Sequence, residues 1–463
     1  MQSVDIQDPI TVHKNYENTV PVEVLNRQSF ESETEFRRNI DSILEDYRQI
    51  LNRAKQHQLG YPIYHVSEGT QDSEPLQGSK HADIDFAPLE KVQNYYINNV
   101  GSPDISTSFA SNSHAFEMGV LHWFAELWNI DNTESWGYIT NGGTESNIQS
   151  LYIARENFPD AVAYASKDAH FSVFKACNIL RVPVEVVDTT DRGEMRYDHV
   201  RRLLEKNHGR PAIVILTCGT TMTGAIDQPS NVVEILHQAG YRDDEYFIHV
   251  DAALSGIFLP LLEDQGAPQI HFKIPGVSSI SCSGHKFLGV PIPCGIMMIR
   301  KKYIERIGNT IEYIASKDLT LTCSRNGHAS LYVWLMLTEL GKDGIRYDAQ
   351  RCIQRAQHVQ ERIHSAGIEC WVNPFSITVV FEKPEDVHFT HAWQLACQGD
   401  VCHIIVMPHI RDATLDTFVS SLVSQKPRVV HRKDLEGIQL PQRDSCYYNV
   451  VSYSTGDGSS STS

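Results

Sequence analysis

The sequence has no apolar run of the roughly 20 residues that a helix needs to cross a lipid bilayer. Residues 1–9 also lack the basic segment, followed by an apolar one, that marks a secretory signal. Positive charge is scarce: 40 Lys and Arg stand against 57 Asp and Glu, a formal net charge of −17. Because this charge would repel phosphates, nucleic acid and an anionic membrane surface are disfavoured as the main partner. We therefore expect a cytoplasmic protein that acts on a small molecule.

The ten cysteines are scattered and lack any Cys-x-x-Cys pair. This spacing favours neither a zinc site nor a disulfide framework, so we expect reduced thiols and no metal centre. The hydrophobic fraction of 41% and the charged fraction of 21% are typical of a soluble globular protein. The length allows two to three structural units around a large core.

Short apolar runs alternate with helical segments up to about residue 300. This alternation predicts an α/β fold with a mostly parallel sheet and helices on both faces. The runs that read as strands are 161–165, 182–187, 212–216, 246–250, 277–281 and 295–299. Helices are predicted at 197–206 and 231–238, and an amphipathic helix with a capping box at Ser32 and Glu35 is predicted near the N-terminus.

The pattern changes after Gly327, where a long helical region runs to about residue 367. Strands are predicted at 377–381 and 401–406, and helices near 390–397 and 413–423. We therefore predict a smaller C-terminal α+β domain. The predicted division is an N-terminal segment with the amphipathic helix (1–88), a large domain (89–320), the small domain (321–425) and a disordered tail (426–463).

Four short motifs carry the candidate chemistry, and each follows a predicted strand. The first, Thr140-Asn-Gly-Gly143-Thr144-Glu-Ser-Asn147, opens a helix, and its glycines let an anion approach the backbone. The first-turn N–H groups and the hydroxyl of Thr144 suit a phosphate. Taken alone, the motif also fits an ordinary capped helix start.

The second and third motifs suit an aromatic ring. His170 lies just past the next strand, where an imidazole can stack on a ring or simply fill a core. Asp251 directly follows the run 246–250, and a buried carboxylate needs a cation or hydrogen bonds. A pyridinium nitrogen would serve, and Ala253 is small enough for a flat ring to lie against the backbone. A purely structural carboxylate is the alternative.

The fourth motif, Ser283-Gly-His285-Lys286, places a primary amine at the carboxyl end of another strand, where open α/β sheets bind ligands. A lysine amine there can form a Schiff base with an aldehyde. Each motif alone is compatible with a structural role, but chance is a poor explanation for all four in this order. Together they predict a site for a phosphorylated pyridine aldehyde.

The chain resembles the group II pyridoxal-phosphate amino-acid decarboxylases, specifically the serine/histidine decarboxylase-like branch. The similarity extends from about residue 60 to residue 423. It rests on the motifs Asn98-Asn-Val-Gly101, Trp136-Gly-Tyr-Ile-Thr-Asn-Gly-Gly-Thr-Glu145, His249-Val-Asp-Ala-Ala-Leu254, Ser283-Gly-His-Lys286, Pro291-Ile-Pro-Cys-Gly295 and Ser324-Arg-Asn-Gly-His328. The resemblance implies the fold type I architecture of PLP-dependent transferases (aspartate aminotransferase-like) and a homodimer with active sites at the interface.

The same resemblance implies roles for the site residues. Lys286 would carry pyridoxal 5'-phosphate as a Schiff base, Asp251 would pair with the pyridinium nitrogen, and His170 and Ala253 would lie on the two faces of the ring. The residues implied around the phosphate are Gly143, Thr144, Ser283, His285 and Ser324, the last reaching the site of the partner. Thr220 would lie near the ring or the substrate carboxylate.

The implied reaction removes carbon dioxide from a small L-amino acid. Related decarboxylases return a proton to Cα from a tyrosine on a mobile loop, and Tyr313 is the candidate here, with a packed helical tyrosine as the alternative. Histidine, serine and a longer apolar amino acid such as methionine remain open as substrates. The stretches 251–256 and 376–381 resemble those of bacterial-type histidine decarboxylases, and this resemblance favours histidine. The segment between Tyr64 and Ile84 departs from the branch and is a candidate border of the substrate pocket.

Three other functions remain compatible with the sequence. The same cofactor supports transamination or aldol-type cleavage. A nucleotide-binding module could use the Gly-Gly-Thr loop, although the Walker lysine spacing and the dinucleotide glycine fingerprint are missing. A non-catalytic scaffold is disfavoured because every position of the chemical constellation is filled.

Overall fold

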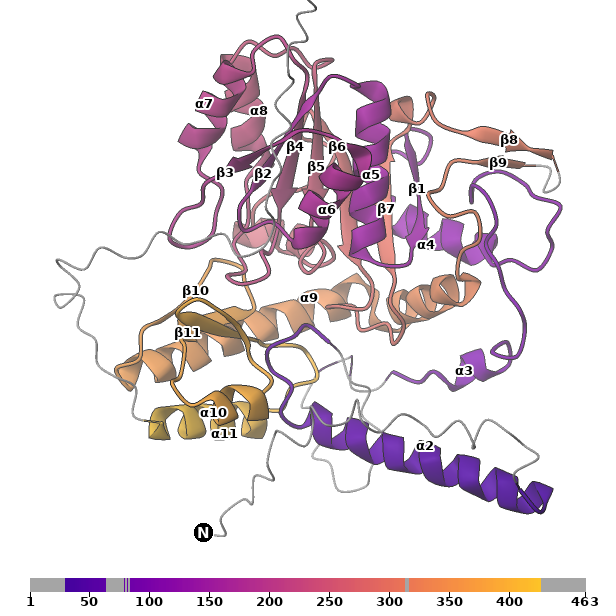
Figure 1. Cartoon of the computed structure of the whole chain (residues 1–463), viewed down its shortest axis with the longest axis vertical. Coiled ribbons are helices and arrows are strands. Elements are labelled where there is room, and N and C mark those ends of the chain that lie inside the picture. Colours follow the sequence, from indigo (N-terminus) through magenta and orange to yellow (C-terminus); the bar gives the residue numbers. More distant parts are fainter. Residues whose placement is uncertain (1–29, 64–78, 80, 82–83, 313–315, 426–463) are drawn as a thin grey trace, which may run out of the picture. The chain divides into compact units, whose positions relative to one another are not determined.

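Figure 1 shows the computed structural model of the chain, which describes residues 30–63, 79, 81, 84–312 and 316–425. Its main element is a seven-stranded sheet in the order β1-β7-β6-β5-β4-β2-β3. The strands are β1 (Ser135–Thr140), β2 (Val162–Ser166), β3 (Val184–Val187), β4 (Ala212–Thr217), β5 (Tyr246–Asp251), β6 (Val277–Ser283) and β7 (Gly295–Arg300). Strands β2 to β6 pair in parallel, whereas β7 runs antiparallel to both β6 and β1. The predicted mostly parallel sheet is confirmed.

The sheet separates two buried cores because successive side chains of a strand point to opposite faces. In β4, Val214 and Leu216 belong to the core that contains Phe124 of α4, whereas Ile213 and Ile215 belong to the core beneath α5 and α6. Figure 1 shows α5 and α6 together on one face. The helices around the sheet are α4 (His114–Leu127), α5 (Gly143–Asn157), α6 (Phe171–Leu180), α7 (Tyr197–Lys206) and α8 (Pro229–Gln238).

A smaller antiparallel sheet follows the long helix α9 (Gly327–Ser365), whose helical path breaks at Gly341, where φ is 60°. The strand order is β10-β11-β13-β12. The elements are β10 (Cys370–Val372), β11 (Thr378–Glu382), α10 (Val387–Ala392), β12 (Ala396–Gln398), β13 (Val401–Ile405) and α11 (Asp412–Ser424). The helix predicted at 390–397 is therefore wrong in its second half, because Cys397 lies in β12, which pairs with β13.

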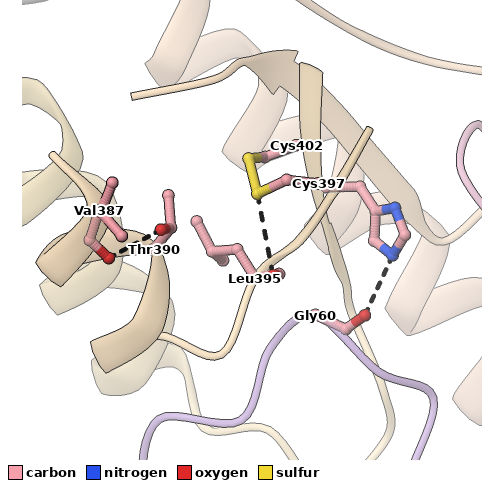
Figure 2. The surroundings of a disulfide bond; sticks show 7 residues. Gly60, Val387, Thr390, Leu395, Cys397 and Cys402 are labelled. Atoms are coloured by element: carbon pink, nitrogen blue, oxygen red, sulfur yellow. Dashed lines mark hydrogen bonds between the residues drawn. A yellow bond between two sulfur atoms is a disulfide. The ribbon is translucent and has the colours of Figure 1, made fainter. Parts of the chain in front are cut away.

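The expectation that all cysteines are reduced thiols is also wrong, because Cys397 and Cys402 form a disulfide (Figure 2). The two residues face each other across β12 and β13 with a Cα–Cα distance of 4.2 Å. They are five residues apart, a spacing that carries no disulfide signal until the hairpin register is known. His403, the residue after Cys402 in β13, has its Nε2 3.0 Å from the carbonyl oxygen of Gly60.

The N-terminal helix α2 (Glu33–Lys55) begins with the predicted capping box. Ser32 Oγ accepts a hydrogen bond from Glu35 N (3.1 Å), and the Glu35 carboxylate accepts one from Glu31 N (2.9 Å). Its apolar side chains remain largely exposed, including Leu44 at 59% and Tyr47 at 56%. None of the described helices is long and apolar enough to span a membrane.

The remaining elements are short. They are α3 (Ala87–Glu90), the 3₁₀ helices η5 (Leu259–Gln265) and η6 (Lys301–Tyr303), and the two-stranded sheet of β8 (Asn309–Ile311) and β9 (Ser316–Asp318). The predicted domain boundaries at residues 88, 320 and 425 stay predictions. The predicted tail 426–463 lies outside the described residues.

Candidate active site

The register of the large sheet brings the predicted phosphate loop beside the Ser283 motif. Gly295, the first residue of β7, pairs with Thr140 of β1 on one side and with Ser283 of β6 on the other. A Cβ added at Gly295 would lie 2.7 Å from Thr140 Oγ1 and 2.9 Å from Ser146 Oγ. Glycine is therefore required there, because any side chain would push the start of α5 away from β7.

The start of α5 collects several residues predicted to surround a phosphate. A Cβ added at Gly143 would lie 3.1 Å from Ser283 Oγ and 3.8 Å from Ala253 Cβ, and one added at Gly142 would lie 3.8 Å from His285 Cε1. Among the described residues, no side chain caps α5 at Gly142. The first-turn N–H groups thus remain available to an anion, and half-buried Thr144 adds a hydroxyl to the same turn.

Asp251, the last residue of β5, is a buried carboxylate with two hydrogen-bond donors. Its Oδ2 accepts from Asn147 Nδ2 (2.8 Å) and its Oδ1 from the backbone N of Ala253 (3.2 Å). Only 3% of the residue is exposed. A cation placed against this carboxylate would compensate the cost of its burial, which suits a protonated ring nitrogen.

His170 forms the N-cap of α6, with Nδ1 2.7 Å from Ser172 Oγ. Burial lowers the pKa of His170, and the nearby charge of Asp251 opposes that shift. The imidazole therefore tends towards its neutral form, in which a flat ring can stack on another ring without a charge to hydrate.

Lys286 lies in the turn after β6 and is partly buried. Burial lowers the pKa of Lys286, while Asp251 and Cys282 act in the opposite direction. The shift enlarges the neutral fraction of the amine, and the neutral amine is the form that attacks an aldehyde. The structure thus places Lys286, Asp251 and His170 within electrostatic reach of one another, as the motif order predicted.

Two predicted residues make their hydrogen bonds elsewhere, and a third lies outside the described residues. Thr220 is buried in the turn after β4, where its Oγ1 accepts from Ala225 N (2.9 Å) and bonds Thr223 Oγ1 (2.7 Å). Ser324 is exposed, and its Oγ accepts from Asn98 Nδ2 (3.1 Å). Within the described residues, no hydrogen bond or ion pair joins Thr220 or Ser324 to Lys286. Tyr313 lies outside the described residues, so its role stays a prediction.

The sequence motifs did not indicate the contacts of the polar side chains behind the site. Asn147 contacts Asp251, Ser172 and His249, and His249 in turn contacts Ser279. A usable signal existed for Asn147: it lies four residues after Gly143, so it shares a helix face with the phosphate loop. The contacts with His249 and Ser172 cross between elements and had no signal in the sequence.

The motifs that contain Asn99 and Arg325 contact each other and the same side chain of α4. Arg325 forms a buried ion pair with Glu117 of α4, and Glu117 accepts a further hydrogen bond from Asn99 Nδ2 (2.7 Å). Arg325 donates to the carbonyl oxygen of Gly101 as well (3.0 Å). These contacts hold the segment that carries Ser324 against the large sheet.

The assembled residues fit a phosphorylated pyridine aldehyde. The uncapped start of α5 suits the phosphate, the amine of Lys286, whose pKa burial lowers, suits the aldehyde, and the buried carboxylate of Asp251 suits a protonated ring nitrogen. Among the described residues, no group of three metal-ligating side chains gathers.

Comparison with known proteins gives concordant results. The family model of the pyridoxal-dependent decarboxylase conserved domain matches residues 99–382. Serine decarboxylase 1 of Oryza sativa subsp. japonica is 39% identical over 83% of this chain and 76% of its own length. Histidine decarboxylase of Solanum lycopersicum is 39% identical over 85% of this chain and 91% of its own length.

A solved structure extends the comparison to the fold. The L-methionine decarboxylase of Streptomyces sp. 590, in complex with L-methionine methyl ester, superposes with a TM-score of 0.75 at 24% identity. The superposition covers 90% of this chain and 98% of the other. At this identity the similarity concerns the fold alone.

Proposed function

This chain belongs to the pyridoxal-dependent decarboxylase family, and we propose that its substrate is L-histidine, which it converts into histamine and carbon dioxide. It is an amino-acid carboxy-lyase with pyridoxal 5'-phosphate as cofactor. The observation that carries the assignment of the site is the buried carboxylate of Asp251, held by Asn147 at the carboxyl end of β5, within electrostatic reach of Lys286, whose pKa burial lowers.

When bound, the cofactor supplies an electron sink for the pair that remains on Cα after carbon dioxide leaves. We propose that Lys286 holds the cofactor and that Asp251 keeps its ring nitrogen protonated. His170 and Ala253 confine the ring between them and exclude water from its faces.

The phosphate is proposed to bind at the start of α5, where Gly143, Thr144, Ser283 and His285 gather. Thr220 is proposed to orient the substrate carboxylate, and Tyr313 to return the proton to Cα. The cost of losing Tyr313 should appear in kcat rather than in cofactor affinity, because the tyrosine is assigned to the proton step alone.

Two stretches that favour histidine pack against the turn that carries Thr220. Ser255 Oγ donates to the carbonyl oxygen of Cys218, and a Cβ added at Gly224 would lie 2.1 Å from Ser376 Oγ. Differences in these stretches therefore reach the proposed substrate carboxylate site through one short turn. The tomato relative named histidine decarboxylase supports the same choice.

Serine is the second candidate substrate, because relatives from rice carry the name serine decarboxylase. The deciding experiment incubates the holoenzyme with a panel of L-amino acids and quantifies the amine and carbon dioxide. Histamine and carbon dioxide in equal amounts are expected. Ethanolamine or 3-methylthiopropylamine as the main product would replace histidine by serine or methionine, and a stoichiometric keto acid would contradict decarboxylation by this site.

We also propose a homodimer with its sites at the subunit interface. The support is the exposed apolar side chains of the described residues, on α2 and at Tyr95 and Tyr96, which are 67% and 72% exposed. Surface-exposed Ser324 would then face the phosphate site of the partner. Mass photometry of the holoenzyme should give twice the chain mass of 52.3 kDa.

Complementation of two inactive variants tests whether two chains share each site. Lys286→Ala lacks the amine, and Ser324→Glu places a negative charge against the proposed phosphate. After the two proteins are mixed through a dissociation step, one site of each mixed dimer combines an intact Lys286 with an intact Ser324. Recovered activity is expected. Activity that stays at the level of the separate variants would contradict a shared site.

We further propose that the protein acts in the cytoplasm. The support is that the described residues contain seven free cysteines, five of them buried, against the single disulfide of Cys397 and Cys402. Cell fractionation against cytoplasmic and membrane markers tests this location.

A further inference from the structure

Asn147, on the first turns of α5, stands at the centre of a buried hydrogen-bond network. Its Nδ2 lies 2.8 Å from Asp251 Oδ2 and 2.9 Å from Ser172 Oγ, and its Oδ1 lies 2.9 Å from His249 Nε2. Only 1% of Asn147 is exposed, and His249 is fully buried. Bulk water is thus absent as a substitute partner for any of these groups.

The chemistry of an amide determines the direction of each bond. The Asp251 carboxylate accepts only, so the NH₂ group of Asn147 must face it, and a flipped amide would set two acceptors against each other. Oδ1 then faces His249 and requires a proton on Nε2. The other ring nitrogen, Nδ1, lies 2.8 Å from Ser279 Oγ and accepts the hydroxyl proton. Burial lowers the pKa of His249 to about 4, which agrees with one proton on the ring.

The second N–H of Asn147 fixes the donor and acceptor roles along a chain of hydrogen bonds that reaches His170 through Ser172. Ser172 Oγ accepts from Asn147, so its own proton points to His170 Nδ1, 2.7 Å away. The backbone N of Ser172 also donates to that nitrogen (3.3 Å). Nδ1 of His170 therefore accepts, and the ring carries its proton on Nε2.

We propose that Asn147 is the positioning residue that sets the donor and acceptor directions of the cofactor site. Through one N–H it holds the Asp251 carboxylate as an acceptor towards the ring nitrogen of the cofactor. Through the other, and Ser172, it keeps His170 in the Nε2–H tautomer. The proposal depends on the cofactor and is independent of which amino acid is decarboxylated.

The test compares two ligands on the apoprotein. One is pyridoxal 5'-phosphate, and the other is its analogue with C–H in place of the ring nitrogen, which cannot pair with Asp251. Asn147→Leu removes a hydrogen bond to a charged group and should weaken binding of pyridoxal 5'-phosphate by about 10- to 100-fold. The loss for the analogue should be smaller by at least about fivefold. Tryptophan fluorescence quenching measures both dissociation constants.

Two further variants test the connection to His170 and provide a control outside the network. Ser172→Ala breaks only the connection to His170, so it should weaken both ligands by the same factor. Asn157→Leu, at the end of the same helix, removes hydrogen bonds to the carbonyls of Ile153 and Tyr303 and should leave both affinities unchanged. An equal loss of both ligands in Asn147→Leu, or no loss of either, would overturn the proposal.

A measurement on the unaltered holoenzyme covers the case in which Asn147→Leu does not fold. Nitrogen-15 spectra of labelled histidines report which ring nitrogen carries the proton. His249 and His170 are both expected as Nε2–H tautomers at pH 7. A proton on Nδ1 of His249 would mean that the amide has the opposite orientation, and the proposed role of Asn147 would be wrong.

Discussion

Lys286 shows how one residue gains its reactivity from its surroundings. Desolvation penalises the ammonium form, so burial lowers the pKa of Lys286 even though Asp251 favours the charge. Under the proposed function, the benefit is a larger fraction of neutral amine, the form that attacks an aldehyde. The cost is folding free energy in the protein without cofactor, because the unfolded chain binds a proton that the folded chain binds less well.

This cost predicts that Lys286→Met raises the melting temperature of the apoprotein at neutral pH. The sign follows from the lowered pKa: below the folded-state pKa the full penalty applies, and it disappears as the pH rises towards the unfolded-state value of about 10.4. The increase in melting temperature of the variant over the unaltered apoprotein should therefore become smaller as the pH rises. Calorimetry of both apoproteins between pH 7 and pH 10 measures it. A gain that grows with pH would contradict the assigned shift.

At the scale of elements, the β1–α5 loop, which we propose binds the phosphate, lies close to β7. Gly295→Ala would insert a Cβ 2.7 Å from Thr140 Oγ1 and 3.1 Å from the backbone carbon of Gly142. We expect a destabilisation of about 1–3 kcal/mol, typical of overpacking, together with weaker cofactor binding. Urea unfolding and cofactor titration measure the two effects.

Gly119→Ala is the matched control for that prediction. Gly119 lies within α4, is exposed, and has no heavy atom within 4 Å of an added Cβ. Alanine should stabilise the helix by up to about 1 kcal/mol and leave cofactor affinity unchanged. Equal effects of the two substitutions would show that crowding at β7 is not the cause.

The buried ion pair of Arg325 and Glu117 connects α4 with the segment before α9. Glu117→Gln would leave the guanidinium buried without its countercharge, so we expect a loss of about 3–5 kcal/mol in the free energy of unfolding. The exposed pair of Glu45 and Arg48 provides the control, and Glu45→Gln should leave the melting temperature unchanged. A small effect of Glu117→Gln would mean that the network of Asn99 and Gly101 holds this segment without the charge.

At the scale of the whole molecule, buried neutral histidines make the fold sensitive to acid. Burial lowers the pKa of both His249 and His403 from 6.5 to about 4. Between these values the unfolded chain binds protons that the folded chain excludes, so stability is full above about pH 6.5 and falls towards pH 4. Each histidine contributes a slope of up to about 1.4 kcal/mol per pH unit.

Urea unfolding at a series of pH values tests this origin of acid sensitivity. His403→Gln should reduce the loss of unfolding free energy between about pH 6.5 and pH 4 by up to the contribution of one histidine. The same substitution at exposed His388 should leave the decline unchanged. A decline that both variants retain in full would assign the acid sensitivity to the carboxylates instead.

The sequence predicted much of the fold because the strongest signals are local. The runs at 212–216 and 246–250 became β4 and β5, and the capping box at Ser32 formed as expected. Where the signal depends on pairing, prediction failed. Cys397 was expected in a helix and as a thiol, but strand pairing places it opposite Cys402.

The sequence by itself determined the chemical inventory: an amine, a carboxylate, an imidazole and an anion-binding loop, in a fixed order at strand ends. Strand ends can be read locally because hydrophobic periodicity and turn residues define them. Only the tertiary structure decided how these groups act together. Asn147 meets Asp251, 104 residues away, and His249, 102 residues away, because α5 packs across the sheet. Contacts between distant segments depend on packing and register, which no short stretch of sequence encodes.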